Sequence, residues 1–164
     1  LCETALRLQA LVPKAGALFI VNDRLDVALA VEADGVHLGQ DDLPARVARR
    51  LLGPDRVLGL SVENGEQARK AAQDGVDYVA IGPVYEARGT KADAGAPIGP
   101  GAIADLRRHT DLPIVAIGGI NHDNVAAVIK AGADGAAVIS AIVSAEDIAQ
   151  SVREMKRRIQ EAGG

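Results

Sequence analysis

Carboxylates follow two apolar runs near the start of the chain. Asp23 comes directly after LFIVN (18–22), and Asp41 and Asp42 follow GVHLGQ (35–40). If these runs are neighbouring parallel strands, their carboxyl ends meet at one edge and the carboxylates gather there. Such carboxylates repel each other unless a cation neutralises them, and Mg²⁺ accepts carboxylate oxygens together with phosphate. Helix N-capping is the alternative, because Asp is common at that position. Both interpretations stay open at this point.

A long polar segment, GPVYEARGTKADAGAPIGP (82–100), offers groups that suit phosphate. Thr90 supplies a hydroxyl and Lys91 a cation, and both bind phosphate oxygens well. A Gly- and Pro-rich connection of this length is usually functional or disordered. The same residues would also fit a solvated charged loop, so the segment alone does not decide between the two.

Small residues follow the last two apolar runs. Gly118 and Gly119 precede a predicted helix, where backbone N–H groups and the positive helix end favour an anion. Ser140 follows the final run, and in barrels of alternating strands and helices the last two strand ends commonly form a phosphate site. Ser61 follows the third run, where helix capping is the simpler interpretation.

The chain lacks the sequence signatures of several other chemistries. It has no HExxH motif and no Cys/His cluster, which argues against zinc. It also has no G-x-S-x-G and no G-x-G-x-x-G motif. We interpret His37 as a core residue with satisfied hydrogen bonds, and His109 and His122 as surface residues at helix ends.

A short repeat organises the elements that must position these residues. It reads EADGVHLG (32–39), AQDGVDYVAIG (72–82) and AGADGAAVIS (131–140), each a helix end followed by an apolar run. Gly suits a helix C-terminus, and short unbroken apolar runs are typical of strands buried on both faces. The predicted strands are 17–22, 35–38, 57–61, 77–81, 113–117 and 135–139. The predicted helices are 2–12, 24–32, 44–52, 64–74, 99–109, 122–131 and 147–160.

Strict alternation of strands and helices predicts an α/β fold with parallel strands in one domain spanning 1–164. An open doubly wound sheet and part of a (β/α)₈ barrel both fit. Function lies at the carboxyl ends of the strands in either case.

Composition and net charge indicate which partners and which cell compartment to expect. The 164 residues carry a formal charge of −4 and include one cysteine, Cys2. No basic stripe is present, so we expect no nucleic-acid partner. No apolar stretch approaches the roughly 20 residues that span a bilayer, so we expect no membrane association. A lone cysteine favours a reducing compartment, and we predict a cytoplasmic protein.

Taken together, the motifs resemble the thiamine-phosphate synthase family. They are LFIVND (18–23), GVHLGQDDLP (35–44), GLS (59–61), YVAIGPVY (78–85), TKADAG (90–95), PIVAIGGI (113–120) and AGADGAAVISAI (131–142). They come in that family's order and spacing over roughly residues 15–160.

The resemblance implies a TIM (β/α)₈ barrel of which six β/α units are present. It implies a Mg²⁺-assisted transferase that couples hydroxymethylpyrimidine pyrophosphate with thiazole phosphate and releases pyrophosphate. Asp23 and Asp42 would then hold the metal. Lys91, Ser61 and Thr90 would be the catalytic residues. The substrate-binding residues would be Asn22, Ser61, Thr90, Lys91, Gly119, Ile139 and Ser140.

The chain departs from the family at two places. The family's two N-terminal β/α units, with their Gln-x-Arg-x-Lys motif, have no equivalent, and QARK (67–70) lies in a predicted helix. We therefore expect a homo-oligomer, or completion by a missing N-terminal segment, because unpaired strand edges invite pairing. The loop YEARGTK (85–91) also lacks one Thr of the family pattern, and Arg88 is the candidate to replace that pyrophosphate contact.

Two other functions are alternatives. One is a thiazole tautomerase of the same superfamily, although Asp41 and Asp42 favour the synthase. The other is a phosphate-binding half-barrel without catalytic activity.

Overall fold

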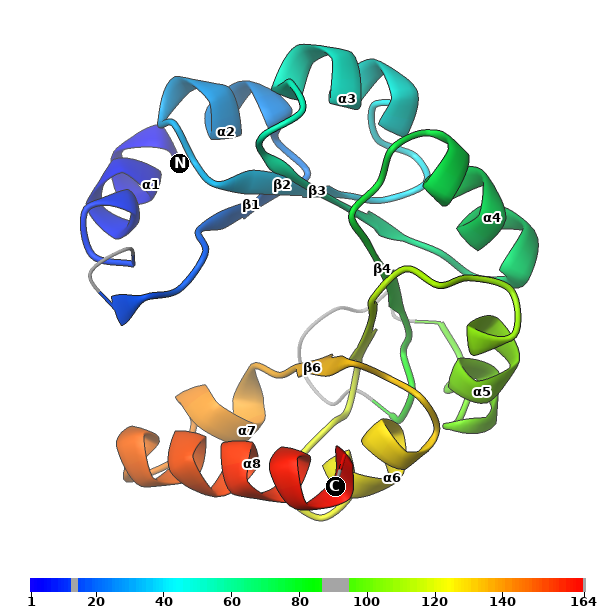
Figure 1. The fold of residues 1–164 in the computed structure, drawn as a ribbon. Coiled ribbons are helices and arrows are strands. Elements are labelled where there is room, and N and C mark those ends of the chain that lie inside the picture. The colour runs from blue at the N-terminus through cyan, green and yellow to red at the C-terminus, as the bar shows by residue number, and fades with distance from the viewer. Residues whose placement is uncertain (13–14, 87–94, 164) are drawn as a thin grey trace. The chain divides into compact units, whose positions relative to one another are not determined.

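The computed structural model describes residues 1–12, 15–86 and 95–163 and shows strands alternating with helices (Figure 1). The strands are β1 (Ile20–Asn22), β2 (Gly35–Leu38), β3 (Val57–Ser61), β4 (Tyr78–Ile81), β5 (Ile114–Ile117) and β6 (Gly135–Ala137). The helices are α1 (Cys2–Gln9), α2 (Leu25–Ala30), α3 (Ala45–Leu52), α4 (Gly65–Gln73), α5 (Gly101–Arg107), α6 (Val125–Lys130), α7 (Ser140–Val143) and α8 (Ile148–Gly163). This order confirms the predicted α/β class with six β/α units.

The chain divides into two compact units. Unit 1 comprises Leu1–Val62 and Gln67–Val79, and unit 2 comprises Glu63–Glu66 and the described residues from Ala80 onward. The expectation of a single domain over 1–164 stays a prediction.

Unit 1 is built on parallel pairing of β1 with β2 and of β2 with β3. Helices α2 and α3 lie along one side of these strands (Figure 1). The fully buried aliphatic side chains Val36, Leu38 and Leu58 come from the strands, and Ala28 and Ala48 come from these helices. Successive strand residues point to opposite faces, so His37 projects to the face opposite Val36 and Leu38.

Unit 2 pairs β5 with β6 in parallel, with Val115 beside Gly135 and Ile117 beside Ala137. Its buried side chains include Ile103 of α5, Ile114 of β5 and Val128 of α6. Helix α8 packs on α6 and α7, and its residue Met155 is buried. The core is therefore aliphatic, as in unit 1.

The predicted and observed elements follow the same order, with one addition, although β1 begins at Ile20 rather than 17 and α1 ends at Gln9 rather than 12. The strands 35–38 and 57–61 have the predicted bounds. Strand β6 ends at Ala137 rather than 139, because α7 begins at Ser140. This four-residue helix was not predicted, since it is too short to show a 3.6-residue period. QARK (67–70) lies inside α4, as predicted.

An arginine at the end of α3 connects that helix to the amino ends of two strands. Arg49 donates through Nη2 to Asp77 Oδ2 at 2.5 Å and through Nε to the carbonyl oxygen of Gly75 at 2.8 Å. Its Nη1 donates to two further carbonyl oxygens, those of Gly53 and Arg56. Asp77 Oδ2 in turn accepts the N–H of Leu58 in β3 at 2.7 Å. Helix, loop and strand are thereby joined through one guanidinium.

Unit 2 repeats this arrangement around Arg107 at the end of α5. Arg107 donates through Nη2 to Asp134 and through Nε to the carbonyl oxygen of Gly132. Asp134 Oδ2 accepts the N–H of Ile114 in β5 at 2.7 Å. The two Arg–Asp pairs, Arg49–Asp77 and Arg107–Asp134, therefore stabilise equivalent positions of the two units.

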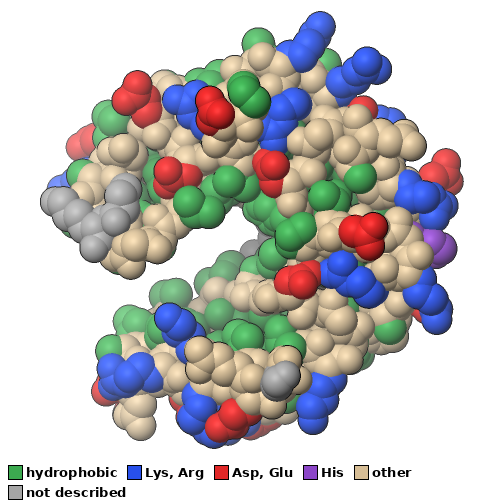
Figure 2. Space-filling view, in the orientation of Figure 1, with side chains coloured by type: hydrophobic (Ala, Val, Ile, Leu, Met, Phe, Trp, Pro, Cys, Tyr) green, Lys and Arg blue, Asp and Glu red, His purple; other side chains and the backbone are tan. Residues whose placement is uncertain are grey.

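The surface carries both signs of charge. On the face drawn in Figure 2, acidic and basic side chains are interspersed, and hydrophobic side chains lie between them. Within the described ranges, none of the helices combines the length and apolarity needed to cross a bilayer.

Candidate functional site

Four of the predicted residues lie at the carboxyl ends of β1, β2 and β3 in unit 1. Asn22 ends β1 and Asp23 follows it, while Ser61 ends β3. Asp42 lies in the loop between β2 and α3. The register sets Asn22 beside His37 and Leu38 beside Leu60, so each strand ends one residue further along than the strand before it. The sequence correctly placed these side chains at one edge of unit 1.

Asp23 adopts an uncommon backbone conformation. Its φ is +64°, and its N–H donates to the carbonyl oxygen of His37 at 2.8 Å. Asp is one of the few residues that tolerate this region, and departures of this kind cluster at functional sites. Helix α2 begins after Arg24, with no side-chain capping bond. The carboxylate of Asp23 is exposed and has no hydrogen-bond partner among the described residues. The capping interpretation is therefore wrong for Asp23.

Asp42 folds back on its own strand end. Its Oδ2 accepts the N–H of Gly39 at 2.7 Å, which fixes the carboxylate direction. Helix α3 begins after Pro44, again with no side-chain capping bond, so capping is wrong for Asp42 too. Within the described ranges Oδ1 has no hydrogen-bond partner.

The two carboxylates act on one histidine. Burial lowers the pKa of the His37 imidazole below its ordinary value of 6.5, while the charges of Asp23 and Asp42 oppose this shift. Both carboxylates therefore lie close enough to His37 to influence the pKa of its ring. The described part of the chain holds no group of three or more His, Cys, Asp or Glu side chains placed for a metal. Mg²⁺, however, often takes only one or two protein carboxylates and completes its shell with water and phosphate. The free oxygens of Asp23 and Asp42 fit that donor set.

Ser61 is oriented by a histidine and does not cap a helix. Its Oγ lies 3.0 Å from His37 Nε2. The first turn of α4 is capped instead by Asn64, whose Oδ1 accepts the N–H of Glu66 at 3.1 Å. Gln40 Nε2 donates to the carbonyl oxygen of Ser61 at 2.6 Å and holds the strand end. The capping interpretation of Ser61 is therefore wrong.

His37 and Tyr78 form a contact that the sequence analysis missed. His37 Nδ1 lies 2.9 Å from the Tyr78 hydroxyl, and the two rings stack with centroids 5.4 Å apart. Burial raises the pKa of the Tyr78 phenol. The prediction that His37 has satisfied hydrogen bonds is confirmed, although the residue is only half-buried. Gly59 lies beside His37 in the register, but a glycine within an apolar run does not by itself indicate a contact between residues on the two flanking strands.

Four more residues singled out by the sequence analysis follow β5 and β6 in unit 2. Gly118 and Gly119 have φ values of +94° and +64°. A Cβ at Gly119 would lie 2.7 Å from the carbonyl oxygen of Glu86, so a side chain cannot fit. Ile139 and Ser140 are exposed and open α7. Parallel pairing of β5 with β6 brings these two strand ends to the same edge of unit 2.

Thr90 and Lys91, which the resemblance makes catalytic, lie outside the described residues. Their assignment stays a prediction.

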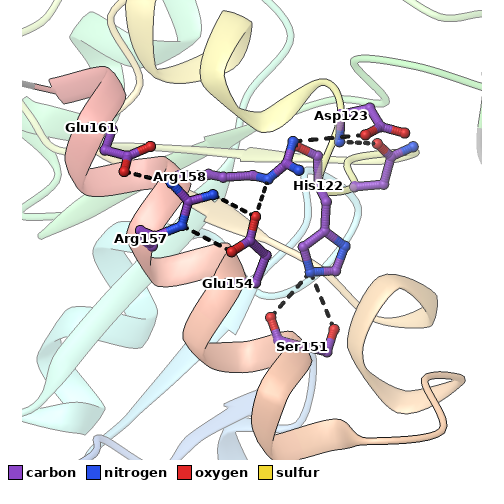
Figure 3. Close-up of polar contacts among 8 residues, drawn as sticks. His122, Asp123, Ser151, Glu154, Arg157, Arg158 and Glu161 are labelled. Atoms are coloured by element: carbon purple, nitrogen blue, oxygen red, sulfur yellow. Dashed lines mark hydrogen bonds and ion pairs between the residues drawn. The ribbon is translucent and has the colours of Figure 1, made fainter.

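A second histidine–serine contact lies in unit 2 (Figure 3). His122 Nε2 lies 3.2 Å from Ser151 Oγ and 3.1 Å from the carbonyl oxygen of Ser151. Ser151 is buried in α8, and its Oγ donates to the carbonyl oxygen of Ala141 at 2.9 Å. Arg158 Nη1 donates to the carbonyl oxygen of His122 at 2.7 Å. These bonds tie α7, α8 and the loop before α6 together.

The expectation that His122 lies at the surface near a helix end is only partly right, since its ring is half-buried.

Comparison with known proteins places the chain in a family. The family model for thiamine monophosphate synthase matches residues 1–142. Thiamine-phosphate synthase of Moorella thermoacetica is 52% identical over 164 residues, which are 100% of this chain and 78% of that protein. Thiamine-phosphate synthase of Chloroflexus aurantiacus is 53% identical over 154 residues, which are 94% of this chain and 70% of that protein. The chain belongs to the thiamine-phosphate synthase family.

The fold supports the same assignment. Thiamine phosphate pyrophosphorylase from Pyrococcus furiosus superposes with a TM-score of 0.88 and 41% identity, covering 99% of this chain and 77% of that one. The predicted resemblance to thiamine-phosphate synthase, its TIM-like fold and its transferase function in thiamine biosynthesis are therefore confirmed. The alternatives of a tautomerase and of a half-barrel without catalytic activity have no support among these relatives.

Proposed function

We propose that Asp23 and Asp42 hold Mg²⁺ while this thiamine-phosphate synthase couples hydroxymethylpyrimidine pyrophosphate to thiazole phosphate. The observation that carries the proposal is a pair of carboxylates at neighbouring strand ends, neither of which caps a helix. One of them sits on a backbone with positive φ, and the other is aimed by the N–H of Gly39. Bound Mg²⁺ would neutralise the pyrophosphate as it leaves.

The side chains of unit 1 orient the pyrimidine substrate. Asn22 and Ser61 end β1 and β3, the two strands that flank β2, and they offer an amide and a hydroxyl to the pyrimidine or its pyrophosphate. Thr90 and Lys91 are proposed to bind the pyrophosphate oxygens, where a fixed positive charge favours its departure.

Backbone groups of unit 2 are proposed to bind the thiazole phosphate. Gly119, Ile139 and Ser140 offer N–H groups at one edge, and the positive φ of Gly119 lets the chain approach an anion closely. The carbon–oxygen bond to pyrophosphate breaks, and the thiazole nitrogen then attacks the resulting pyrimidine cation. No protein nucleophile is required. Cytoplasmic location, and oligomerisation or completion by an N-terminal segment, stay predictions from the sequence.

A comparison of three Asp→Asn variants tests the metal assignment. Asn keeps an oxygen for the N–H of Gly39 at position 42 and tolerates positive φ at position 23, so each change removes charge with little effect on the backbone. Asp41→Asn is the matched control, because Asp41 is the exposed neighbour that receives no metal role. The measurement is the rate of thiamine phosphate formation at increasing Mg²⁺ concentration.

Asp23→Asn and Asp42→Asn are expected to raise the Mg²⁺ concentration for half-maximal rate more than about tenfold, since even loss of a residue that only orients a ligand costs about 10–100-fold. Asp41→Asn should leave it unchanged. An equal response of all three variants, or no Mg²⁺ dependence in the unmodified protein, would refute the assignment.

A further inference from the structure

Three side chains from β2, β3 and β4 form a hydrogen-bonded line in unit 1. The Tyr78 hydroxyl is 2.9 Å from His37 Nδ1, and His37 Nε2 is 3.0 Å from Ser61 Oγ. The line therefore runs from a half-buried phenol through an imidazole to a hydroxyl at the edge where substrate is proposed to bind. Within the described ranges, neither hydroxyl has another side-chain partner.

Gly59 makes room for this line. It lies in β3, directly beside His37 in the register. A Cβ at position 59 would collide with the ring of Tyr78, so that ring occupies the space that a side chain would fill. His37 and Tyr78 consequently stack across the intervening strand, with an interplanar angle of 27°. The glycine thus supports one defined placement of both rings.

The donors and acceptors of a neutral His37 ring can be arranged in two ways. In one, Nδ1 donates to Tyr78 and the Ser61 hydroxyl donates to Nε2. In the other, the Tyr78 hydroxyl donates to Nδ1 and Nε2 donates to Ser61 Oγ. A phenol is a stronger hydrogen-bond donor and a weaker acceptor than an aliphatic hydroxyl, because its oxygen lone pair is delocalised into the ring. The second arrangement therefore pairs each group in its better role.

We propose that Tyr78 is a positioning residue, which fixes the proton of His37 on Nε2 and so leaves the Ser61 hydroxyl proton free to bind substrate. The inference rests on the proposed function in placing phosphorylated substrate at this edge. Tyr78 itself touches no substrate in this scheme. It acts through His37, and its effect exists only while Ser61 carries a hydroxyl.

A double-mutant cycle tests that dependence. Tyr78→Phe keeps the ring that stacks on His37 and removes only the hydroxyl. Alone, it is expected to lower kcat/KM for the pyrimidine substrate about two- to tenfold, the value of one hydrogen bond. In a Ser61→Ala background the same change should alter kcat/KM less than about twofold. The free-energy effects of two mutations add when the residues are independent, and they do not add when one residue acts through the other.

The matched control removes a different histidine-bound hydroxyl. Ser151→Ala breaks the contact with His122 in unit 2. Tyr78→Phe is expected to lower kcat/KM by the same factor in the Ser151→Ala background as in the unmodified protein. A purely structural role of Tyr78 would give equal losses in all three backgrounds, and that result would overturn the inference.

A measurement independent of activity reads the proton directly. In ¹⁵N nuclear magnetic resonance of the unmodified protein, His37 should show its proton on Nε2, and Tyr78→Phe should weaken this preference. A proton on Nδ1 in the unmodified protein would overturn the inference, even if Tyr78→Phe failed to fold.

The two proposals fail in distinguishable ways. Absence of thiamine phosphate formation by the unmodified protein would refute the proposed function. Binding of inorganic pyrophosphate with Mg²⁺, measured by calorimetry, then replaces kcat/KM as the readout of the same cycle. Coupling between Tyr78→Phe and Ser61→Ala in binding would still support the positioning role, and additivity would overturn it.

Discussion

Among the described residues, a histidine–serine contact lies in each unit, and the two contacts are of nearly equal length. His37 Nε2 lies 3.0 Å from Ser61 Oγ, and His122 Nε2 lies 3.2 Å from Ser151 Oγ. In unit 2 the Ser151 hydroxyl donates to the carbonyl oxygen of Ala141 and is buried. In unit 1 Ser61 is half-exposed, and its hydroxyl bonds only to His37 among the described residues.

The two histidine–serine contacts differ in the additional group that hydrogen-bonds to each of them. A carbonyl oxygen uses the proton of Ser151, so that pair joins helices. A phenol saturates the far nitrogen of His37, so that pair keeps a hydroxyl proton available. The same two residue types therefore serve packing in one unit and a candidate site in the other, according to what lies next to them.

Removing the buried hydroxyl of Ser151 should lower the free energy of unfolding more than removing the half-exposed hydroxyl of Ser61. Ser151→Ala leaves the carbonyl oxygen of Ala141 and the His122 ring without this partner, which we expect to lower the free energy of unfolding by about 1–3 kcal/mol. Ser61→Ala should lower it by less than about 1 kcal/mol, because water can replace a half-exposed hydroxyl. Urea titrations of the two variants measure both values. Equal losses would remove the distinction between the pairs.

The pH dependence of stability should carry the signature of His37. Burial lowers its pKa, so below pH 6.5 the unfolded chain takes up a proton at this residue more readily than the folded chain does. The contribution of His37 to stability is therefore present above its ordinary pKa and is lost as pH falls toward its lower folded value. Between about pH 7 and 5, stability should fall more steeply in the unmodified protein than in His37→Gln. Parallel curves would contradict the burial argument.

The smallest effect concerns the charges around the His122–Ser151 contact. Arg157 and Arg158 bond to Glu154 and hold the pKa of that carboxyl down, at about 2 (Figure 3). The group is half-exposed, so water and salt screen these ion pairs. Glu154→Gln should lower the melting temperature less than Ser151→Ala does, and the difference from the unmodified protein should vanish at about 1 M salt. A loss that persists at high salt would mean that Glu154 contributes by packing.

Residues that follow apolar runs could be located from the sequence alone. Asp23, Asp42 and Ser61 lie where the strand pattern put them, because parallel strands bring their carboxyl ends to one edge. What each side chain does there depends on its tertiary neighbours. Capping was open for Asp23 and favoured for Ser61, and only the starts of α2 and α4 ruled it out.

Other features had no readable signal. The contact between His37 and Tyr78 joins residues 41 positions apart through an intervening glycine. Likewise, the repeated Asp-Gly pattern was interpreted through its glycine, whereas Asp134 also receives the N–H of a strand 20 residues earlier. Sequence periodicity reports which face a residue occupies, and it does not report which distant residue meets it.

The two Arg–Asp pairs lie at the amino ends of their strands, whereas the candidate ligand groups among the described residues lie at the carboxyl ends. The residues that anchor helices to strands are thus different from the residues proposed to bind ligands. Substrate preference can consequently be redesigned at one end, by library selection for instance, while the anchors that hold helix to strand are kept intact.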